Sequence, residues 1–185
     1  MPLPLLTLDL DGVICRPVLG QNVGIHATFL DPLAEPPPAR VYPSWLNAPL
    51  DHLRFDFRRP MPGVHEALRE LGRRRRLVIV TGRRTPPTRW LRHHGLDALV
   101  DDVVVNRTGL RSPHYKLAAL REIGATEHVE DDPRTAQLLA QAGSVRVYLC
   151  TWPRNVEVAF DPGVERVADL GDLARRLRTQ SGQPD

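Results

Sequence analysis

Short runs of hydrophobic residues recur along the chain, and each run stops at polar or acidic residues. The runs that we predict to be strands lie at 3–8, 77–80, 103–105, 128–129 and 145–150. Buried parallel strands are continuous apolar runs because helices cover both faces of their sheet. The polar residues that follow such strands meet at one edge of the sheet, where the ligand sites of parallel sheets lie.

Between these runs, apolar residues follow the spacing of three and four that is typical of amphipathic helices. We predict helices at about 64–71, 88–94, 117–123, 136–142 and 170–177, the third with an apolar face of Leu117, Leu120 and Ile123. Gly95, Gly124 and Gly143 follow three of these segments and suit the left-handed position after a helix. Asp169 is placed to cap the last helix. Because strands alternate with helices, we expect an α/β fold, a three-layer sandwich.

The stretch from about 15 to 60 departs from this alternation. It is rich in proline, and Leu53, Phe55 and Phe57 alternate with charged residues, as in one half-buried strand. We interpret the stretch as an insertion after the first strand, too short for its own core and suited to a flap or small lid. The chain is then one domain over 1–178, and we expect 179–185 to be a disordered tail.

Composition is that of a globular protein, with 42% hydrophobic residues and a formal net charge of +3. The opening segment contains Asp9 and Asp11 and lacks a basic start, so we do not expect a signal peptide, nor is any run long enough to span a membrane.

The spacing of Cys15 and Cys150 indicates neither a disulfide framework nor a metal site, and we expect free thiols in a reducing cytoplasm. The four arginines at 73–76 suggest a solvated helix end rather than a nucleic-acid site.

Lys116 is the only lysine in a chain with 25 lysine and arginine residues. An arginine side chain is a broad planar fork, whereas a lysine is a compact charge on a thin stem that can enter a crowded phosphate or carboxylate site. The lone lysine therefore suggests a functional position, and a chance lysine on a solvated helix is the alternative.

Acidic residues end two of the predicted strands. Asp9 and Asp11 follow the first strand, where alternation places them on the same side, and three acids follow another strand at 130–132. Close carboxylates repel one another and favour a hard cation with oxygen ligands, such as Mg²⁺. One carboxylate of such a site can act as a nucleophile while another moves a proton.

These segments resemble the four motifs of the haloacid dehalogenase (HAD) superfamily, and they occur in the order of that family. The four segments are 9–14, 78–83, Lys116 at a helix start, and 129–133. The resemblance implies a Rossmann-like domain with five core parallel strands. It also places the insertion at the first cap position of the family, as a flap or a minimal cap.

The resemblance further implies a role for each matching residue. Asp9 would be the nucleophile that forms an aspartyl-phosphate, and Asp11 would protonate the leaving oxygen and then activate water. Thr81 would donate a hydrogen bond to a phosphoryl oxygen, and Lys116 would neutralise charge between Asp9 and the phosphoryl group. Family members that pump ions carry Thr where this chain has Asp11, and haloacid dehalogenases lack the second Asp, so phosphate-ester hydrolysis is the expected reaction.

The metal implied by the family is Mg²⁺, held by Asp9, by the backbone carbonyl of Asp11 and by an acid of the fourth motif. Alignment of the strand end makes Asp131 the ligand and Asp132 its support, and a shifted register is the alternative. The neighbouring acids could instead orient Lys116 or water molecules.

The resemblance implies that the substrate is a phosphorylated small molecule or a nucleic-acid end, and Gly82 and Arg83 are the predicted substrate-binding residues. The insertion and the segment after the last strand faintly resemble the 5′-nucleotidase and polynucleotide kinase phosphatase branch, which favours a nucleotide or nucleic-acid terminal phosphate. Trp45 and Trp152 could stack on a base, although packing is the commoner role of tryptophan. The arginines at the ends of the insertion could hold a second phosphate. A sugar phosphatase and a non-catalytic HAD-fold binding protein are the alternative functions.

Overall fold

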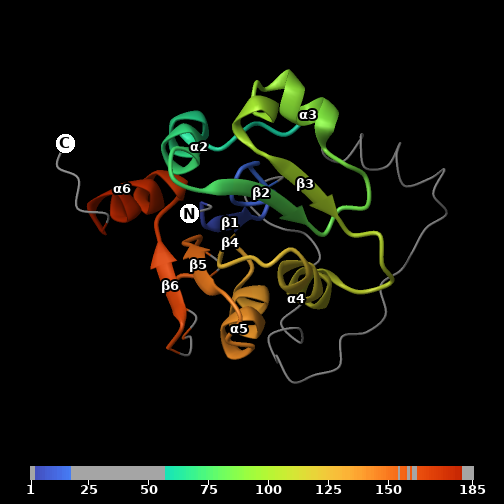
Figure 1. The fold of residues 1–185 in the computed structure, drawn as a ribbon, viewed down its shortest axis with the longest axis vertical. Helices are drawn as coiled ribbons and strands as arrows, with labels where there is room; N and C mark the ends of the chain where they lie inside the picture. The colour runs from blue at the N-terminus through green and yellow to red at the C-terminus, as the bar shows by residue number, and fades with distance from the viewer. Residues whose placement is uncertain (1–2, 18–56, 154, 158, 160–161, 181–185) are drawn as a thin grey trace.

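The strands form one parallel sheet of six in the computed structural model, which describes residues 3–17, 57–153, 155–157, 159 and 162–180 (Figure 1). The order across the sheet is β3-β2-β1-β4-β5-β6, and every neighbouring pair is parallel. The strands are β1 (Leu5–Leu8), β2 (Arg76–Thr81), β3 (Asp102–Val105), β4 (Glu127–Glu130), β5 (Arg146–Cys150) and β6 (Val164–Val167). The chain starts in the middle of the sheet and builds outward in both directions, so β1 and β4 lie side by side at its centre.

Helices cover both faces of the sheet, which confirms the predicted three-layer α/β sandwich. Figure 1 shows α2, α3 and α6 on one face and α4 and α5 on the other. The helices are α2 (Val64–Gly72), α3 (Thr88–His93), α4 (Ser112–Glu122), α5 (Pro133–Gln141) and α6 (Leu170–Gln180), with a 3₁₀ turn, η3, at Asp97–Leu99. Among these described helices, none has the length and apolar character needed to cross a bilayer.

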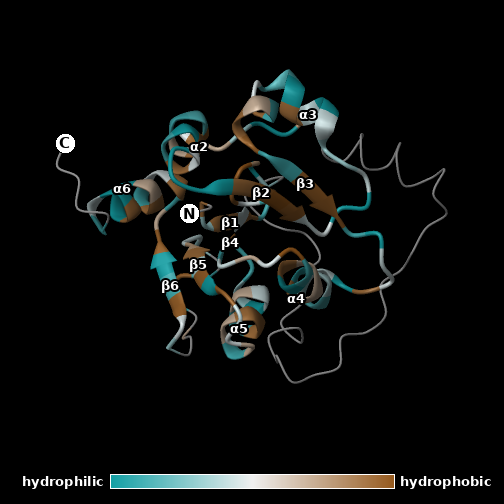
Figure 2. Ribbon diagram, viewed as in Figure 1, coloured by the Kyte–Doolittle hydropathy of each residue, from teal (hydrophilic) through white to brown (hydrophobic). Residues whose placement is uncertain are grey.

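Each face of the sheet carries its own apolar core, and Figure 2 shows hydrophobic stretches along strands such as β2 and β3. The core under α2, α3 and α6 is built around fully buried side chains that include Leu8, Leu68, Trp90 and Leu173. The smaller core under α4 and α5 includes Val80, Leu120, Leu139 and Leu149. Alternate residues of the central strands supply the two cores, because successive side chains of a strand point to opposite faces.

The sheet has one strand more than the five that we predicted. β6 has the sequence Val-Glu-Arg-Val and pairs with β5, and it forms the edge of the sheet among the strands of the described residues. Glu165 and Arg166 are only partly buried there. An edge strand needs no continuous apolar run, and our prediction relied on such runs.

The buried face of α4 differs from the face that we predicted. Leu117 and Ile123 are only partly buried, and the helix begins at Ser112 rather than near 117. The buried residues of the helix are Tyr115, Lys116, Ala119 and Leu120. The apolar pattern predicted a different face because the helix turns its one lysine toward the sheet.

Other local predictions concern helix ends and the insertion. Gly95, Gly124 and Gly143 have φ values of 65°, 68° and 63°, which confirms their left-handed conformation. The Asp169 carboxylate accepts the N–H of Asp172 at 2.8 Å, which confirms the cap of α6. The proline-rich segment and the Leu53 and Phe55 positions lie outside the described residues, and α6 extends to Gln180. Phe57 is 83% exposed and lies in a turn, so it is not the half-buried strand residue that we predicted.

The loop after β1 brings the two ends of the insertion together beside the sheet. Ile14 and Cys15 both donate to the carbonyl of Leu10, which folds the loop back on itself. The Arg16 N–H donates to Arg59 O and the Met61 N–H donates to Ile14 O, both at 2.8 Å. The described residues on either side of the insertion, 14–16 and 59–61, therefore lie side by side just after β1.

Candidate active site at the carboxyl edge of the sheet

Three buried carboxylates meet where β1 and β4 end. Asp9 follows β1, Glu130 ends β4 and Asp131 follows it, and the Asp9 N–H donates to Val129 O at 2.9 Å. One oxygen of each carboxylate lies within 4.8 Å of the others, and the three residues are 6%, 0% and 1% exposed. Parallel pairing of the two central strands thus brings together acids that are more than 120 residues apart in sequence.

Lys116 lies among these carboxylates and not on a solvated helix face. Its Nζ is 2.9 Å from Asp9 Oδ1 and 2.7 Å from Glu130 Oε2, and its side chain is 3% exposed. Burial disfavours the ammonium, yet the two carboxylates outweigh burial and raise the pKa of Lys116 above its ordinary value. The single lysine of the chain therefore carries a positive charge at the centre of the acidic cluster.

The pKa values of the two carboxylates around Lys116 shift in opposite directions. Burial raises the pKa of Asp9 to about 8, with added effects from Glu130 and Asp11, while Lys116 opposes the shift. Burial also disfavours ionised Glu130, but Lys116 and His128 hold its pKa below its usual range. The hydrogen bond and the lowered pKa both make Glu130 a counter-ion of Lys116.

Glu130 has a hydrogen-bond donor for every acceptor position of its carboxylate. Oε2 accepts from Lys116 Nζ at 2.7 Å and from His128 Nε2 at 3.2 Å. Oε1 accepts from the backbone N–H groups of Asp131 and Asp132 at 3.0 and 3.1 Å. An ionised carboxylate has about four lone-pair positions, so Glu130 orients its neighbours and has no position left for a metal ion.

Asp132 directs its carboxylate away from the cluster and caps α5. It accepts the Arg134 N–H at 3.1 Å, pairs with the Arg134 guanidinium at 2.7 Å and accepts from the Thr135 hydroxyl at 3.3 Å. We predicted Asp131 and Asp132 as metal ligands at the end of β4. Of these two, it is Asp131 that lies beside Asp9.

The loop after Asp11 lies directly against Asp131. Gly12 has a φ of 85°, and a Cβ at this position would overlap the Asp131 carboxylate, so only glycine fits here. On the other side, Asn155 donates from Nδ2 to the carbonyls of Asp131 and Cys150 at 3.1 and 2.9 Å. The loops after β1, β4 and β5 are therefore fixed to one another around the Asp131 backbone.

Asp11 is held by two arginines. Arg58 Nη1 donates to Oδ1 at 2.7 Å, and Arg83 donates to Oδ1 at 2.6 Å and to Oδ2 at 3.0 Å. Both guanidiniums are more buried than the carboxylate, at 9% and 5% exposed against 19%. The Arg58 backbone is anchored in turn, because Trp90 Nε1 donates to its carbonyl at 2.8 Å.

Thr81 and Gly82 complete the edge of the site next to β1. The Thr81 side chain is buried, and its hydroxyl oxygen accepts the Arg83 N–H at 3.3 Å. A Cβ at Gly82 would lie 2.6 Å from Ser112 Oγ, so glycine lets the end of β2 approach the start of α4. The structure thus brings together the four predicted catalytic residues, Asp9, Asp11, Thr81 and Lys116.

Sequence reasoning did not assign a role in the site to Arg58, His128 or Asn155. Arg58 was considered only as one of several arginines that could hold a phosphate. His128 offered a signal, since a titratable side chain stands inside an apolar run that was predicted to be buried. Asn155 offered none, because its contacts come from the meeting of two loops.

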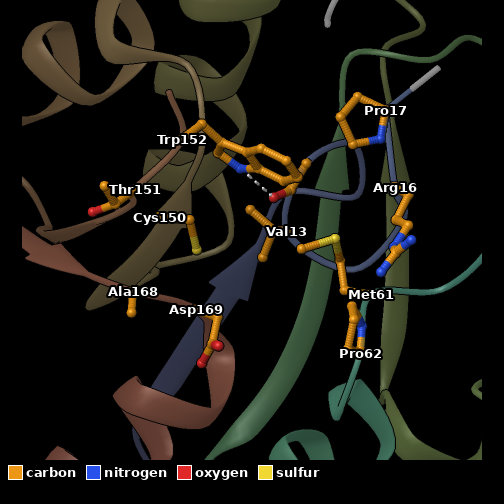
Figure 3. Close-up of a pocket in the computed structure, with 11 residues that line it drawn as sticks. Val13, Arg16, Pro17, Met61, Pro62, Cys150, Thr151, Trp152, Ala168 and Asp169 are labelled. Atoms are coloured by element: carbon orange, nitrogen blue, oxygen red, sulfur yellow. Dashed lines mark hydrogen bonds between the residues drawn. The ribbon is translucent and has the colours of Figure 1, made fainter. Parts of the chain in front are cut away.

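A cavity of about 590 Å³ adjoins the loop after β1 (Figure 3). Val13, Met61 and Trp152 form an apolar lining, with the Arg16 guanidinium beside them. Trp152 Nε1 donates to Gly12 O at 3.0 Å, so the indole both packs on the core and holds the loop that carries Asp11. The cavity is in the size range of small-molecule sites.

Comparison with known proteins finds similarity in structure. No protein-family model and no curated protein sequence matches the chain. CbbY from Rhodobacter sphaeroides, solved in complex with phosphate, is 16% identical with a TM-score of 0.60, covering 93% of this chain and 96% of its own. YfnB from Bacillus subtilis, bound to magnesium, is 15% identical with a TM-score of 0.60, covering 96% and 100%. L-2-haloacid dehalogenase from Xanthobacter autotrophicus, with chloropropionic acid covalently bound, is 12% identical with a TM-score of 0.61, covering 96% and 99%.

The fold and the site define a Rossmann-like α/β protein with a buried cluster of carboxylates and one lysine at the carboxyl edge of its sheet. Its fold is that of the haloacid dehalogenase superfamily, which confirms the resemblance seen in the four sequence motifs at the level of the fold.

Proposed function

We propose that this protein is a Mg²⁺-dependent phosphohydrolase that cleaves phosphomonoesters through covalent attack by Asp9. The observation that carries the proposal is the position of Lys116, 2.9 Å from Asp9 Oδ1 inside a buried acidic cluster. Phosphoryl transfer depends on positioning and on neutralising the charge of the phosphoryl oxygens. A fixed ammonium beside a nucleophilic carboxylate supplies both.

The reaction has two steps. An Asp9 carboxylate oxygen attacks phosphorus, the bond to the ester oxygen breaks, and the leaving oxygen takes a proton from Asp11. Asp11, now a carboxylate, then removes a proton from a water molecule that attacks the phosphorus of the aspartyl-phosphate, which releases phosphate and regenerates Asp9. Because Arg58 and Arg83 occupy the Asp11 oxygens, at least one of these ion pairs opens when substrate enters. Thr81 donates its hydroxyl hydrogen to a phosphoryl oxygen, and Gly82 and Arg83 contact the phosphate beside it.

The donor set fits a hard divalent cation. Asp9 and Asp131 would hold Mg²⁺, since their oxygens lie close together and buried carboxylate oxygens are its preferred protein ligands. When bound, the metal supplies positive charge that helps to orient the phosphoryl group. Asp132 supports this arrangement from the start of α5 by fixing the backbone that follows Asp131.

One neighbour with this fold is a dehalogenase, so the fold alone does not choose the reaction. Asp11 favours the phosphatase. A carboxylate two residues after the nucleophile can serve as acid and base for an oxygen leaving group. Halide departure requires no such proton.

The cavity beside Gly12 supports a nucleotide or nucleic-acid terminal phosphate as the substrate. Its apolar lining with an indole suits a planar group, and the Arg16 guanidinium suits a second anion. A phosphate-release screen over nucleotides, 3′-phosphorylated oligonucleotides and sugar phosphates tests this choice. Turnover of sugar phosphates alone would favour the metabolite phosphatase, and no turnover of any phosphomonoester would favour a binding protein.

Asp9→Asn is the first test of the nucleophile. The amide matches the carboxylate in shape but cannot form the acyl-phosphate, so we expect a folded protein without measurable turnover. Circular dichroism and phosphate release are measured on the same preparation. A near-native rate in this variant would refute covalent catalysis by Asp9.

Removal of the metal is the second test. We expect phosphate release to stop in EDTA, to return with Mg²⁺, and to return poorly with Ca²⁺, whose larger and looser coordination shell disturbs in-line attack. Full activity in the chelator contradicts the metal site.

A further inference from the structure

His128 and Thr7 are polar residues inside an otherwise apolar core. They lie directly opposite each other on the paired strands β4 and β1, and both side chains are fully buried. The surrounding core under α4 and α5 is built from aliphatic side chains such as Val78, Val147 and Leu149. Because burying polar groups there is costly, the pair needs a compensating interaction.

Among the described residues, Glu130 is the charged group to which His128 is hydrogen-bonded. Both side chains point to the same face of β4 because they are two residues apart on a strand, and His128 Nε2 lies 3.2 Å from Glu130 Oε2. The same Oε2 atom accepts from Lys116 Nζ at 2.7 Å, and Lys116 contacts Asp9. A continuous chain of contacts therefore runs from the core to the proposed nucleophile.

The contacts of the ring determine which of its nitrogens carries the proton. An ionised carboxylate can only accept, so Nε2 must carry hydrogen where it faces Glu130. On the other side of the ring, Nδ1 lies 2.8 Å from Thr7 Oγ1, which also lies 2.9 Å from the Glu127 carbonyl. A neutral ring with hydrogen on Nε2 leaves Nδ1 as an acceptor, so the one hydroxyl hydrogen of Thr7 then turns to Nδ1 rather than to Glu127 O. Burial lowers the pKa of His128 despite the nearby carboxylate, which agrees with a neutral ring of this tautomer.

We propose that His128 is a positioning residue, which donates from Nε2–H to Glu130 and so holds the Glu130 carboxylate, and through it Lys116, in place beside Asp9. Thr7 supports this tautomer when its hydroxyl donates to Nδ1 instead of to the Glu127 carbonyl. Three side chains from two neighbouring strands thus fix one lysine that comes from a separate helix. The kinetic part of this inference rests on the proposed phosphatase function, whereas the tautomer does not.

The first measurement reads the tautomer directly in the wild-type protein. Long-range ¹H–¹⁵N correlation spectra of the folded chain at neutral pH should show a neutral His128 ring with hydrogen on Nε2. Thr7→Val removes the hydroxyl and should shift the Nδ1 resonance. A ring that carries hydrogen on Nδ1 instead would overturn the inference, whatever the protein turns over.

The second measurement compares two substitutions of His128. His128→Leu keeps the apolar volume but removes the donor, and we expect kcat to fall by roughly ten- to a hundredfold with KM changed by less than about threefold, as for other residues that orient an active group. His128→Gln places an amide N–H near the position of Nε2 and should recover most of kcat. A fully active leucine variant, or a folded glutamine variant that has lost activity, would overturn the proposal.

The two measurements separate this inference from the proposed function. If the wild-type protein hydrolyses no phosphomonoester, the phosphatase proposal fails while the tautomer measurement still tests His128. If the leucine variant does not fold, the kinetics of the glutamine variant and the spectra of the wild-type protein decide whether His128 positions Glu130.

Discussion

At the scale of single residues, Lys116 offers the sharpest test. Its ammonium lies between Asp9 and Glu130, and 3% of the side chain is exposed. A site this enclosed has no room for the larger, planar guanidinium of arginine. We expect Lys116→Arg to fold and to lose about two to three powers of ten in kcat, the usual effect of removing one well-placed electrostatic group. Phosphate release measures the loss, and Arg121→Lys on the exposed side of the same helix is the matched control. An active Lys116→Arg enzyme would show that any cation serves.

At the scale of elements, the start of α5 allows a test of which acid caps the helix and which acid binds the metal. We assign the cap to Asp132 and the metal to Asp131. Asp132→Ala should lower the free energy of unfolding by about 1–2 kcal/mol, because the cap of α5 is lost, whereas Asp132→Ser should retain most of it. Both variants should still gain thermal stability from added Mg²⁺, and Asp131→Asn should not. Melting temperatures with and without Mg²⁺ measure this, and loss of the Mg²⁺ effect in Asp132→Ser would make Asp132 a ligand.

At the scale of the whole molecule, two buried thiols report on unfolding. Cys15 and Cys150 are 0% and 3% exposed, and burial raises the pKa of Cys15 to about 12 and that of Cys150 well above its ordinary value. Since only the thiolate reacts, we expect an aromatic disulfide reagent at pH 8 to modify the folded protein slowly and the denatured protein at once. Rapid modification of two thiols in the folded protein would contradict this burial.

The same thiols predict how stability changes in alkaline solution. Below the ordinary thiol pKa of about 8.5 both states keep the proton, so the contribution of the thiols to stability is complete. As pH rises from there toward 12, the unfolded chain ionises while the folded chain does not, and the free energy of unfolding falls. Cys15→Ala should reduce this alkaline loss in urea titrations between pH 8 and 10.

The local chemistry of the sequence was enough to predict the class of fold and to nominate residues for the candidate site. Apolar runs that end in Asp9, Thr81 and the acids at 130–132 indicate parallel strands with polar carboxyl ends, and the structure places these ends together. Apolar runs predict these strands correctly because central parallel strands are buried on both faces. β6 was missed for the same reason, since an edge strand with Glu165 and Arg166 carries no such run.

Only the tertiary structure decided which groups of the site contact one another. Three adjacent acids have similar chemistry in sequence, yet Glu130 bonds to Lys116, Asp131 lies against Gly12 and Asp132 caps a helix. These roles depend on which way each side chain points as the strand ends and the helix begins. The pairs of Asp11 with Arg58 and Arg83, and of His128 with Thr7, join parts of the chain that are tens of residues apart. Hydrophobic periodicity specifies which face of an element is buried, but the partners of a buried charge are set by the packing of whole elements.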